Sequence, residues 1–174
     1  VIGAGVAGVA AYHALRKRGI ECVVFEAKGR IGGLWVGNYF GACVQLPLYL
    51  YEYPEQRFKH DVRGNPSMDQ VCEYLETFVD ANGIRDSFRL MSKVTSALQL
   101  EDSSWALSIE DLTTGESRIE EFAYLVMCNG LCSDKPNRIK LEGEEHFLGK
   151  LMHSSEYRSL EVFAGKNVVV LGMG

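Results

Sequence analysis

The first eight residues carry a glycine pattern that limits what this chain can fold into. Gly3-x-Gly5-x-x-Gly8 follows a short apolar start and precedes a helical pattern. The first glycine permits a tight turn, the second lets the backbone approach a pyrophosphate, and the third lets a helix pack closely on a strand. Phosphates then bind at the helix N-terminus, where free N–H groups and the positive end of the helix dipole lie. The pattern therefore predicts a βαβ unit that binds a dinucleotide.

The residues after the glycines supply the rest of this unit. Residues 6–18 predict a helix with small alanine side chains at helical spacing, and Gly19 fits the position just after its end. Residues 20–26 form a β-branched run typical of a buried strand. Glu26 ends that strand at the distance where an acidic residue accepts hydrogen bonds from ribose hydroxyls. The alternative, an ordinary βαβ unit with chance glycines, does not explain why all four positions match.

Composition excludes several other classes of protein. The chain has 174 residues, of which 47% are hydrophobic and 24% charged, as in a folded globular domain. Its net charge is −5 and no basic run alternates with aromatic residues, so we expect no nucleic-acid partner. No stretch approaches the roughly 18 apolar residues of a membrane span. Since both ends resemble the start of a nucleotide site and no Met comes first, we expect a piece of a longer protein, truncated at both ends.

Cysteine and histidine usage indicates no metal centre. The five cysteines form no C-x-x-C pair and predict buried, reduced thiols in an intracellular protein. They are Cys22, Cys43, Cys72, Cys128 and Cys132. No histidine or second cysteine pair completes a zinc site beside the last two. His13, His60 and His146 are expected to be surface or structural residues.

The middle of the chain predicts an irregular segment and then a helix. Residues 28–66 are rich in aromatic residues and proline and show little periodicity, so we expect an ordered excursion that lines a ligand. Ser67-x-x-Gln70 is the pattern of a capping box. It predicts a helix that runs to about Asn82 and stops at the following glycine.

Strand patterns dominate the second half. Residues 88–122 alternate in polarity around turn residues and predict a small antiparallel meander. Residues 124–128 and 167–171 are short apolar runs, each followed by glycine, and both predict strands. The second run continues into Gly172-Met-Gly174, which is similar to the strand and Gly3-x-Gly5 motif at the start of the chain.

A second glycine pair follows Glu26 and points to a particular dinucleotide. Gly32-Gly33-Leu34-Trp35 resembles the extended FAD-binding signature of flavoproteins with two dinucleotide domains. In those proteins the paired glycines let the chain pass close to the ribityl-pyrophosphate arm of the flavin. The resemblance implies that Gly33, Leu34 and Trp35 face this arm. The alternative for Trp35 is a simple core aromatic residue.

A later motif is similar to that of one family. Phe147-x-Gly149-x-x-x-His153-x-x-x-Tyr157 resembles the signature of class B flavin-dependent monooxygenases, in particular the flavin-containing monooxygenase family. The related Baeyer–Villiger monooxygenases usually carry Trp where this chain has Tyr157. In the family this stretch joins two domains and supports their geometry and the coupling of the cofactors. The resemblance therefore implies no catalytic base at His153.

The resemblance extends over essentially the whole chain, with two departures. Cys128-Asn129-Gly130 stands where Ala-Thr-Gly is usual, and Gln45 stands where many members have Asn. Gln45 is nevertheless a candidate for a flavin contact. The cofactor-binding residues that the resemblance implies are Gly3, Ala4, Gly5, Val6, Ala7, Gly8, Glu26, Gly33, Leu34, Trp35, Gln45, Gly172 and Gly174.

The resemblance also implies a fold. It is α/β, with an FAD/NAD(P)-binding Rossmann-like three-layer domain of the glutathione-reductase type and an antiparallel β-meander. Residues 1–165 then form an incomplete FAD-binding domain. Residues 166–174 contribute the first strand and the start of an NADPH-binding domain.

The function implied is NADPH- and O₂-dependent oxygenation of a soft nitrogen or sulfur nucleophile in a small molecule, through a C4a-hydroperoxyflavin. NADPH is implied by the family and not by residues of this chain. Since FAD carries the chemistry, we expect no acid–base pair and identify no catalytic side chain. An intracellular location, in the cytoplasm or on the cytoplasmic face of the endoplasmic reticulum, is implied as well.

Three alternatives stay open at this point. A Baeyer–Villiger monooxygenase acting on ketones has the same fold, and Tyr157 argues against it. A disulfide reductase often has a redox pair of cysteines after the second glycine pair, where this chain has only Cys43. A non-catalytic FAD- or nucleotide-binding remnant is the alternative from another class.

Overall fold

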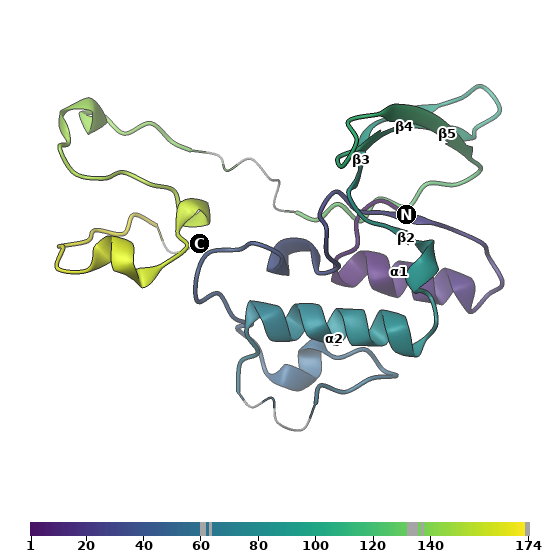
Figure 1. The fold of residues 1–174 in the computed structure, drawn as a ribbon, viewed down its shortest axis with the longest axis horizontal. Coiled ribbons are helices and arrows are strands. Elements are labelled where there is room, and N and C mark those ends of the chain that lie inside the picture. The colour runs from purple at the N-terminus through teal and green to yellow at the C-terminus, as the bar shows by residue number, and fades with distance from the viewer. Residues whose placement is uncertain (60–61, 63, 132–135, 137, 173–174) are drawn as a thin grey trace.

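In a computed structural model of the chain, the described residues are 1–59, 62, 64–131, 136 and 138–172. Two helices lie side by side next to a small sheet, and a long segment from residue 138 onward reaches away from this body (Figure 1). The N-terminus lies within the body, next to the sheets, whereas the C-terminal segment forms the opposite side of the molecule. The dinucleotide pattern is therefore part of the body.

A parallel arrangement of short strands forms the centre of the body. Strand β1 (Val24–Phe25) pairs in parallel with β2 (Phe88–Arg89). Ile2 forms parallel bridges to Phe25 on one side and to Met127 on the other. Helix α1 (Val6–Arg16) connects Ile2 to β1, which gives the predicted βαβ unit with its parallel crossover.

Helix α2 (Met68–Ala81) packs beside α1 and closes the main core. The predicted capping box is confirmed: the Gln70 amide donates to the Ser67 hydroxyl, and the Ser67 amide donates to the Gln70 side chain. Phe78 of α2 is fully buried and meets the ring of His13 of α1 edge-on, with centroids 4.8 Å apart. His13 is thus a structural residue of the core, as predicted.

The predicted meander is confirmed as a three-stranded antiparallel sheet. Its strands β3 (Ser92–Gln99), β4 (Trp105–Asp111) and β5 (Ser117–Phe122) pair in the order β3-β4-β5. Leu107 and Ile109 of β4 point inward and pack with Phe25 in a second core cluster. This cluster attaches the meander to the parallel strands.

Short 3-10 turns occupy the remaining segments. They are Gly33–Trp35, Leu48–Tyr51, Arg85–Ser87, Glu144–His146, Ser154–Glu156 and Leu160–Phe163. The first two belong to the aromatic excursion after β1, whose described part packs on α2 through the stacked rings of Phe58 and Tyr74, 4.2 Å apart. The last three belong to the C-terminal segment.

Four predicted element boundaries need correction. Helix α1 ends at Arg16, and residues 17–19 form a turn. The strand predicted over 20–26 is reduced to β1, whose two residues are in register with the two residues of β2. The strand predicted over 124–128 is a single bridge at Met127. Residues 167–171 form no strand: their side chains are exposed, and a strand needs a paired neighbour to persist.

The cysteines are less buried than expected. All four described cysteines are free, but only Cys72 is buried, while Cys43 is exposed and Cys22 and Cys128 are half-buried. Cys132 and His60 lie outside the described residues. Within the described part of the chain, no helix is long and apolar enough to cross a membrane, and no cluster of metal-binding side chains occurs.

Candidate dinucleotide site

The two glycine motifs, far apart in the sequence, contact each other in the structure. A Cβ atom on Gly33 would lie 2.7 Å from the Cα of Gly5, closer than real Cβ contacts. Gly33 also has a φ of +57°, in the left-handed region that favours glycine. The amide of Gly32 donates to the carbonyl oxygen of Ala4 at 3.0 Å. The second pair therefore forms one continuous surface with the first motif.

The third glycine of the first motif permits the close packing that the sequence predicts. A Cβ on Gly8 would lie 1.8 Å from the carbonyl oxygen of Gly3. Helix α1 therefore touches the turn that precedes it. Gly3 itself, at φ +98°, passes the carbonyl oxygen of Cys128, which a Cβ would approach to 2.5 Å. Side chains at these two positions are excluded by backbone atoms.

The N-terminus of α1 is suited to an anion. Gly5 is the N-cap, no side chain caps the helix, and no acidic residue lies in the first turn. The first hydrogen bond that enters the helix runs from the Val9 amide to Gly5, so the amides of Val6 and Ala7 have no intrahelical acceptor. Together with the helix dipole they form the place where a phosphate group binds in such folds.

Glu26 lies at the edge of this site and holds the first glycine turn. Its side chain is buried, with 7% of the residue exposed. Oε2 accepts the Ala4 amide at 2.7 Å, and Oε1 accepts the Lys28 amide at 2.8 Å. A carboxylate has about four lone-pair positions. The two amide donors therefore leave acceptor capacity for ribose hydroxyls, and the residues present fit an adenosine diphosphate group.

Two basic residues that sequence patterns did not indicate connect the segment after β1, Lys28 to the second glycine pair and Arg30 to α2. The Nζ atom of Lys28 donates to the carbonyl oxygens of Gly33 at 3.0 Å and Val36 at 2.8 Å. Arg30 forms an ion pair with Glu76 of α2, in which Nε lies 3.0 Å from Oε1. Their only signal in the sequence is their position between Glu26 and the glycine pair.

The residues expected to face the flavin arm have different environments. Leu34 is 54% exposed at the surface of its turn. Trp35 is half-buried, packs against the main core and meets Tyr51 edge-on at 6.3 Å. Trp35 therefore has the core contacts of the simpler alternative, whereas Leu34 is open to a ligand. Gln45 is exposed, and the structure records no contact that brings it to the glycine motifs.

The residues of the later signature occupy the C-terminal segment. The ring of Phe147 covers Gly149, where a Cβ would lie 2.5 Å from the ring. Nδ1 of His153 lies 2.8 Å from the Ser155 hydroxyl and caps the turn Ser154–Glu156, so it serves a local structural purpose. Tyr157 meets Phe40 edge-on at 5.9 Å, and its carbonyl oxygen accepts the Phe40 amide. Tyr157 thereby links this segment to the excursion after the second glycine pair.

The structure records no contact of Gly172 with the first site. Gly172 has a φ of +92°, and no atom lies within 4 Å of its would-be Cβ. Gly174 lies outside the described residues.

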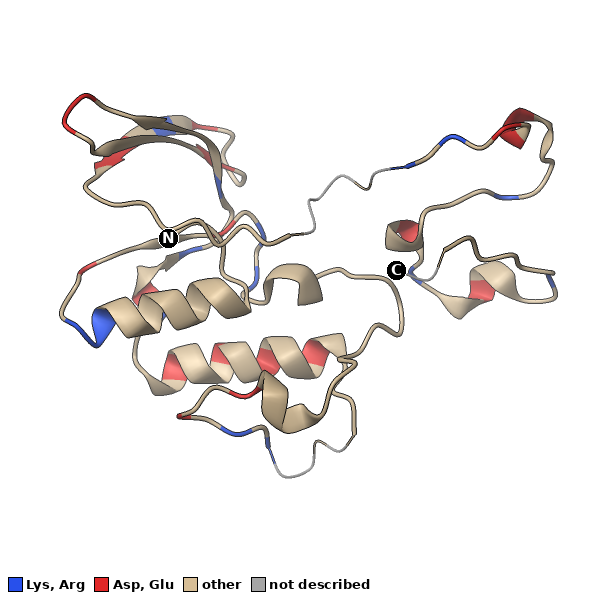
Figure 2. Cartoon of the chain, turned by 180° about the vertical axis from the view of Figure 1, so that it is seen from behind, with Lys and Arg blue, Asp and Glu red and all other residues tan. Residues whose placement is uncertain are grey.

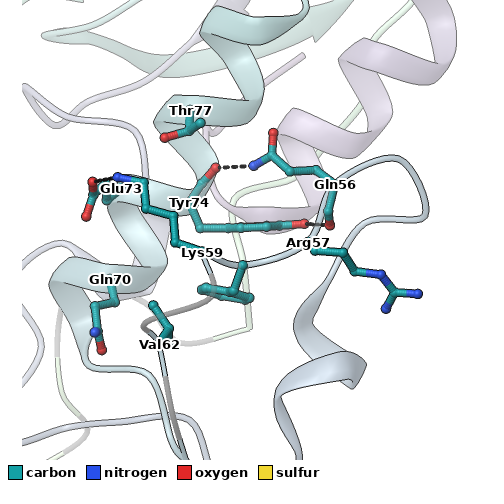
Figure 3. A pocket seen from close by; sticks show the side chains of 9 residues that line it. Gln56, Arg57, Lys59, Val62, Gln70, Glu73, Tyr74 and Thr77 are labelled. Atoms are coloured by element: carbon teal, nitrogen blue, oxygen red, sulfur yellow. Dashed lines mark hydrogen bonds and ion pairs between the residues drawn. The ribbon is translucent and has the colours of Figure 1, made fainter.

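A cavity of about 150 Å³ lies between residues 56–59 and 62 on one side and α2 on the other, and it is distinct from the glycine site (Figure 3). Its lining includes Gln56, Arg57 and Tyr74, and no lining residue belongs to either glycine motif. The Tyr74 hydroxyl donates to the carbonyl oxygen of Gln56, and the Gln56 side chain donates back to the Tyr74 carbonyl. Gln56 and Tyr74 therefore bond each other across the seam between this segment and α2.

Acidic side chains follow α2 along its length (Figure 2). Several of them pair with basic residues from other segments: Asp69 and Glu76 with Arg30, Glu73 with Lys59, and Asp80 with Arg85. This acidic face is therefore a set of ion pairs that hold neighbouring loops.

The parallel βαβ unit, its glycine turn and the buried acid after β1 define a Rossmann-like dinucleotide-binding domain. The pattern of NAD(P)-binding Rossmann-like domains matches residues 1–75, which confirms this class. The pattern of flavin-binding monooxygenase-like proteins matches residues 48–174, more than half of the chain. The chain belongs to the flavin-binding monooxygenase-like family, and the predicted resemblance is confirmed.

Individual relatives come from several branches of this family. Senecionine N-oxygenase of Tyria jacobaeae is 31% identical over all of this chain and 41% of its own length. S-allyl-L-cysteine S-oxygenase from Allium sativum matches 93% of the chain and 42% of that structure at 25% identity, with a TM-score of 0.82. Cyclohexanone monooxygenase from Rhodococcus sp. Phi1 bound to NADP⁺ matches 95% of the chain and 30% of that structure at 32% identity, with a TM-score of 0.70. The chain thus spans about two fifths of the length of the curated relatives it matches.

Proposed function

We propose that this protein is a monooxygenase that binds FAD and uses NADPH to oxygenate a small molecule. The observation that carries the proposal is the contact of the second glycine pair with the first motif, Gly33 against Gly5. A site for a nicotinamide dinucleotide alone has no need of this second surface. Family membership and a solved relative bound to NADP⁺ support the two cofactors.

Different residues of the site bind different parts of FAD. The α1 N-terminus, from Gly5 to Gly8, receives the pyrophosphate, and Glu26 accepts the ribose hydroxyls beside its two amide donors. Gly33 and Leu34 lie along the path toward the flavin. When bound, FAD supplies the redox chemistry by which one oxygen atom of O₂ is transferred to the substrate. The chain itself binds, orients and shields it.

The proposed substrate is a soft nitrogen or sulfur nucleophile. Tyr157 at the end of the signature supports this branch, and so do an N-oxygenase and an S-oxygenase among the relatives. The second candidate is the oxygenation of ketones, which the similarity to a cyclohexanone monooxygenase favours. No side chain of the described site acts as an acid or a base in either case.

We also propose the division of the chain into two parts. Residues 1–165 belong to the FAD-binding domain, and residues 166–174 begin the NADPH-binding domain with Gly172 and Gly174. The exposure of residues 168–171, from 48% to 84%, supports a position at the edge of a second folded unit.

Substrate-stimulated oxidation of NADPH by the purified full-length protein tests this function. The expected protein is yellow, and trimethylamine or a dialkyl sulfide accelerates NADPH consumption more than cyclohexanone does. Stimulation by the ketone alone refutes the substrate class and supports the second candidate. A preparation that neither contains nor takes up FAD refutes the proposal as a whole.

A further inference from the structure

The side chain of Lys28 lies between the two ends of the dinucleotide site. Its backbone amide donates to Oε1 of Glu26, the acid at the ribose end. Its Nζ atom donates to the carbonyl oxygens of Gly33 and Val36, at the flavin end. One residue therefore contacts both of the elements that a bound FAD must span.

The turn that Lys28 holds spans three residues. Gly33–Trp35 is a single 3-10 turn with no side-chain cap, and Gly33 adopts a left-handed φ. The Gly33 carbonyl oxygen also accepts the Val36 amide at 3.2 Å, whereas the donor that the structure records for the Val36 carbonyl oxygen is Nζ. Hydrogen bonds from a charged donor are about twice as strong as neutral ones. Without Nζ, the Val36 carbonyl oxygen loses this donor, the Gly33 carbonyl oxygen keeps only a neutral one, and the side-chain link between Lys28 and the turn is lost.

We propose that Lys28 is a positioning residue that sets the flavin end of the site against its adenosine end. The inference rests on the proposed binding of FAD. Its consequence is selective: the ammonium group governs the position of the turn, whereas the Lys28 amide bond to Glu26 does not depend on the side chain. Loss of the ammonium group is therefore expected to weaken the binding of a ligand that spans both ends. The binding of a ligand that occupies the adenosine end alone is expected to stay the same.

The test compares the affinities of FAD and ADP for the full-length apoprotein and for its Lys28→Met variant. Methionine keeps much of the apolar stem but donates no hydrogen bond. The expected result is an FAD dissociation constant raised about tenfold or more, with the ADP constant changed less than about threefold. The visible circular dichroism of the residual bound flavin is expected to change as well, because the flavin end shifts.

Lys166→Met is the matched control. Lys166 also donates from Nζ to the carbonyl oxygen of a 3-10 turn, that of Val162 at 2.9 Å, but in the C-terminal segment. Both affinities are expected to stay as in the unchanged protein. If Lys28→Met does not fold, as judged by its unfolding transition, Lys28→Gln keeps a neutral donor and is expected to show the same selectivity with a smaller effect.

The outcomes separate this inference from the proposed function. An equal loss of FAD and ADP affinity shows a general structural effect and overturns the positioning role, as does no loss of either. If the unchanged protein binds ADP but not FAD, or neither, the proposed function itself fails and the inference fails with it.

Discussion

Replacement of Gly8 by alanine sets two physical effects of known sign against each other. Gly8 lies in the first turn of α1, where alanine is the better helix former by about 1 kcal/mol. The same substitution places a Cβ atom 1.8 Å from the carbonyl oxygen of Gly3 and 2.9 Å from its carbonyl carbon. Helix propensity alone predicts a more stable protein, whereas packing predicts a less stable one.

The close contact between a Cβ at position 8 and the Gly3 carbonyl group decides whether the substitution stabilises or destabilises the protein. Real Cβ atoms essentially never come within 3.0 Å of another heavy atom, so the helix start or the glycine turn must move by more than 1 Å. The turn cannot yield easily, because the Gly3 amide is bonded to the carbonyl oxygen of Phe25 at 2.8 Å. Overpacking of a fixed site costs about 1–3 kcal/mol and sometimes more. A clash with a backbone oxygen calls for the upper end of this range, about 3 kcal/mol, so we expect Gly8→Ala to lower the free energy of unfolding by about 2 kcal/mol after the gain of about 1 kcal/mol in propensity is subtracted.

Urea unfolding of the full-length apoprotein measures this effect without the cofactor. The control is Gly37→Ala, at a glycine with φ +83° and no atom within 4 Å of its would-be Cβ. Left-handed strain there costs about 1–2 kcal/mol, partly offset by the smaller entropy of the unfolded chain. Gly8→Ala is therefore expected to be the more damaging of the two. A Gly8→Ala protein as stable as the unchanged one, or more stable, would refute the packing argument.

Two further predictions concern hydrogen bonds of single side chains. Burial favours a higher pKa for Glu120, but hydrogen bonds from Arg118 and Arg89 outweigh it, so the pKa lies below its ordinary value of 4.5. Glu120→Gln is expected to cost about 1 kcal/mol at neutral pH. Urea unfolding at several pH values should show this difference vanish as the pH falls below the usual glutamate range, whereas a constant difference contradicts it. The hydroxyl of Tyr53 donates to the carbonyl oxygen of Val6 at 2.6 Å. Tyr53→Phe should lower the melting temperature by about 2–4 °C, by loss of about 1 kcal/mol, and an unchanged melting temperature would show that this bond adds nothing.

Local sequence patterns predicted the elements whose cause is local. The capping box at Ser67 and Gln70 and the glycine after α2 set the limits of that helix almost to the residue. The alternation in the meander reproduced the inward Leu107 and Ile109. In each case the structure-forming signal lies within a few residues of the element that it forms.

Strand lengths could not be predicted in the same way. A β-branched run indicates that a segment is able to be a strand, but its length depends on how many residues its neighbour offers. Residues 20–26 contain only the two-residue strand β1 because β2 is equally short. Residues 167–171 have the same apolar composition and no paired neighbour in the described chain, so they remain extended and exposed.

In the candidate site, too, some residues could be predicted from local sequence and others could not. The glycines and Glu26 were readable because each position imposes a backbone requirement, which local spacing reveals. Arg30 acts on a carboxylate group that the fold brings to it, because Glu76 is 46 positions away in the sequence. Lys28 acts on backbone carbonyl groups 5 and 8 positions away, which any residue type supplies. No local spacing encodes such a pairing, so only the structure could identify these residues.

The contact of Gly5 with Gly33 explains why binding and folding are inseparable in this site. The two glycines come from different segments, and the backbone of Gly5 fills the space that a side chain on Gly33 would need, with a distance of 2.7 Å from such a Cβ to the Cα of Gly5. The same backbone groups that are proposed to approach FAD therefore also complete the packing of α1 on the parallel strands. A substitution at either glycine therefore changes the stability of the protein and its affinity for FAD together. Affinity for FAD can change alone only through a group that positions the turn but is not part of the contact between Gly5 and Gly33. The Nζ atom of Lys28 is such a group, because it acts on carbonyl oxygens at the outer end of the turn.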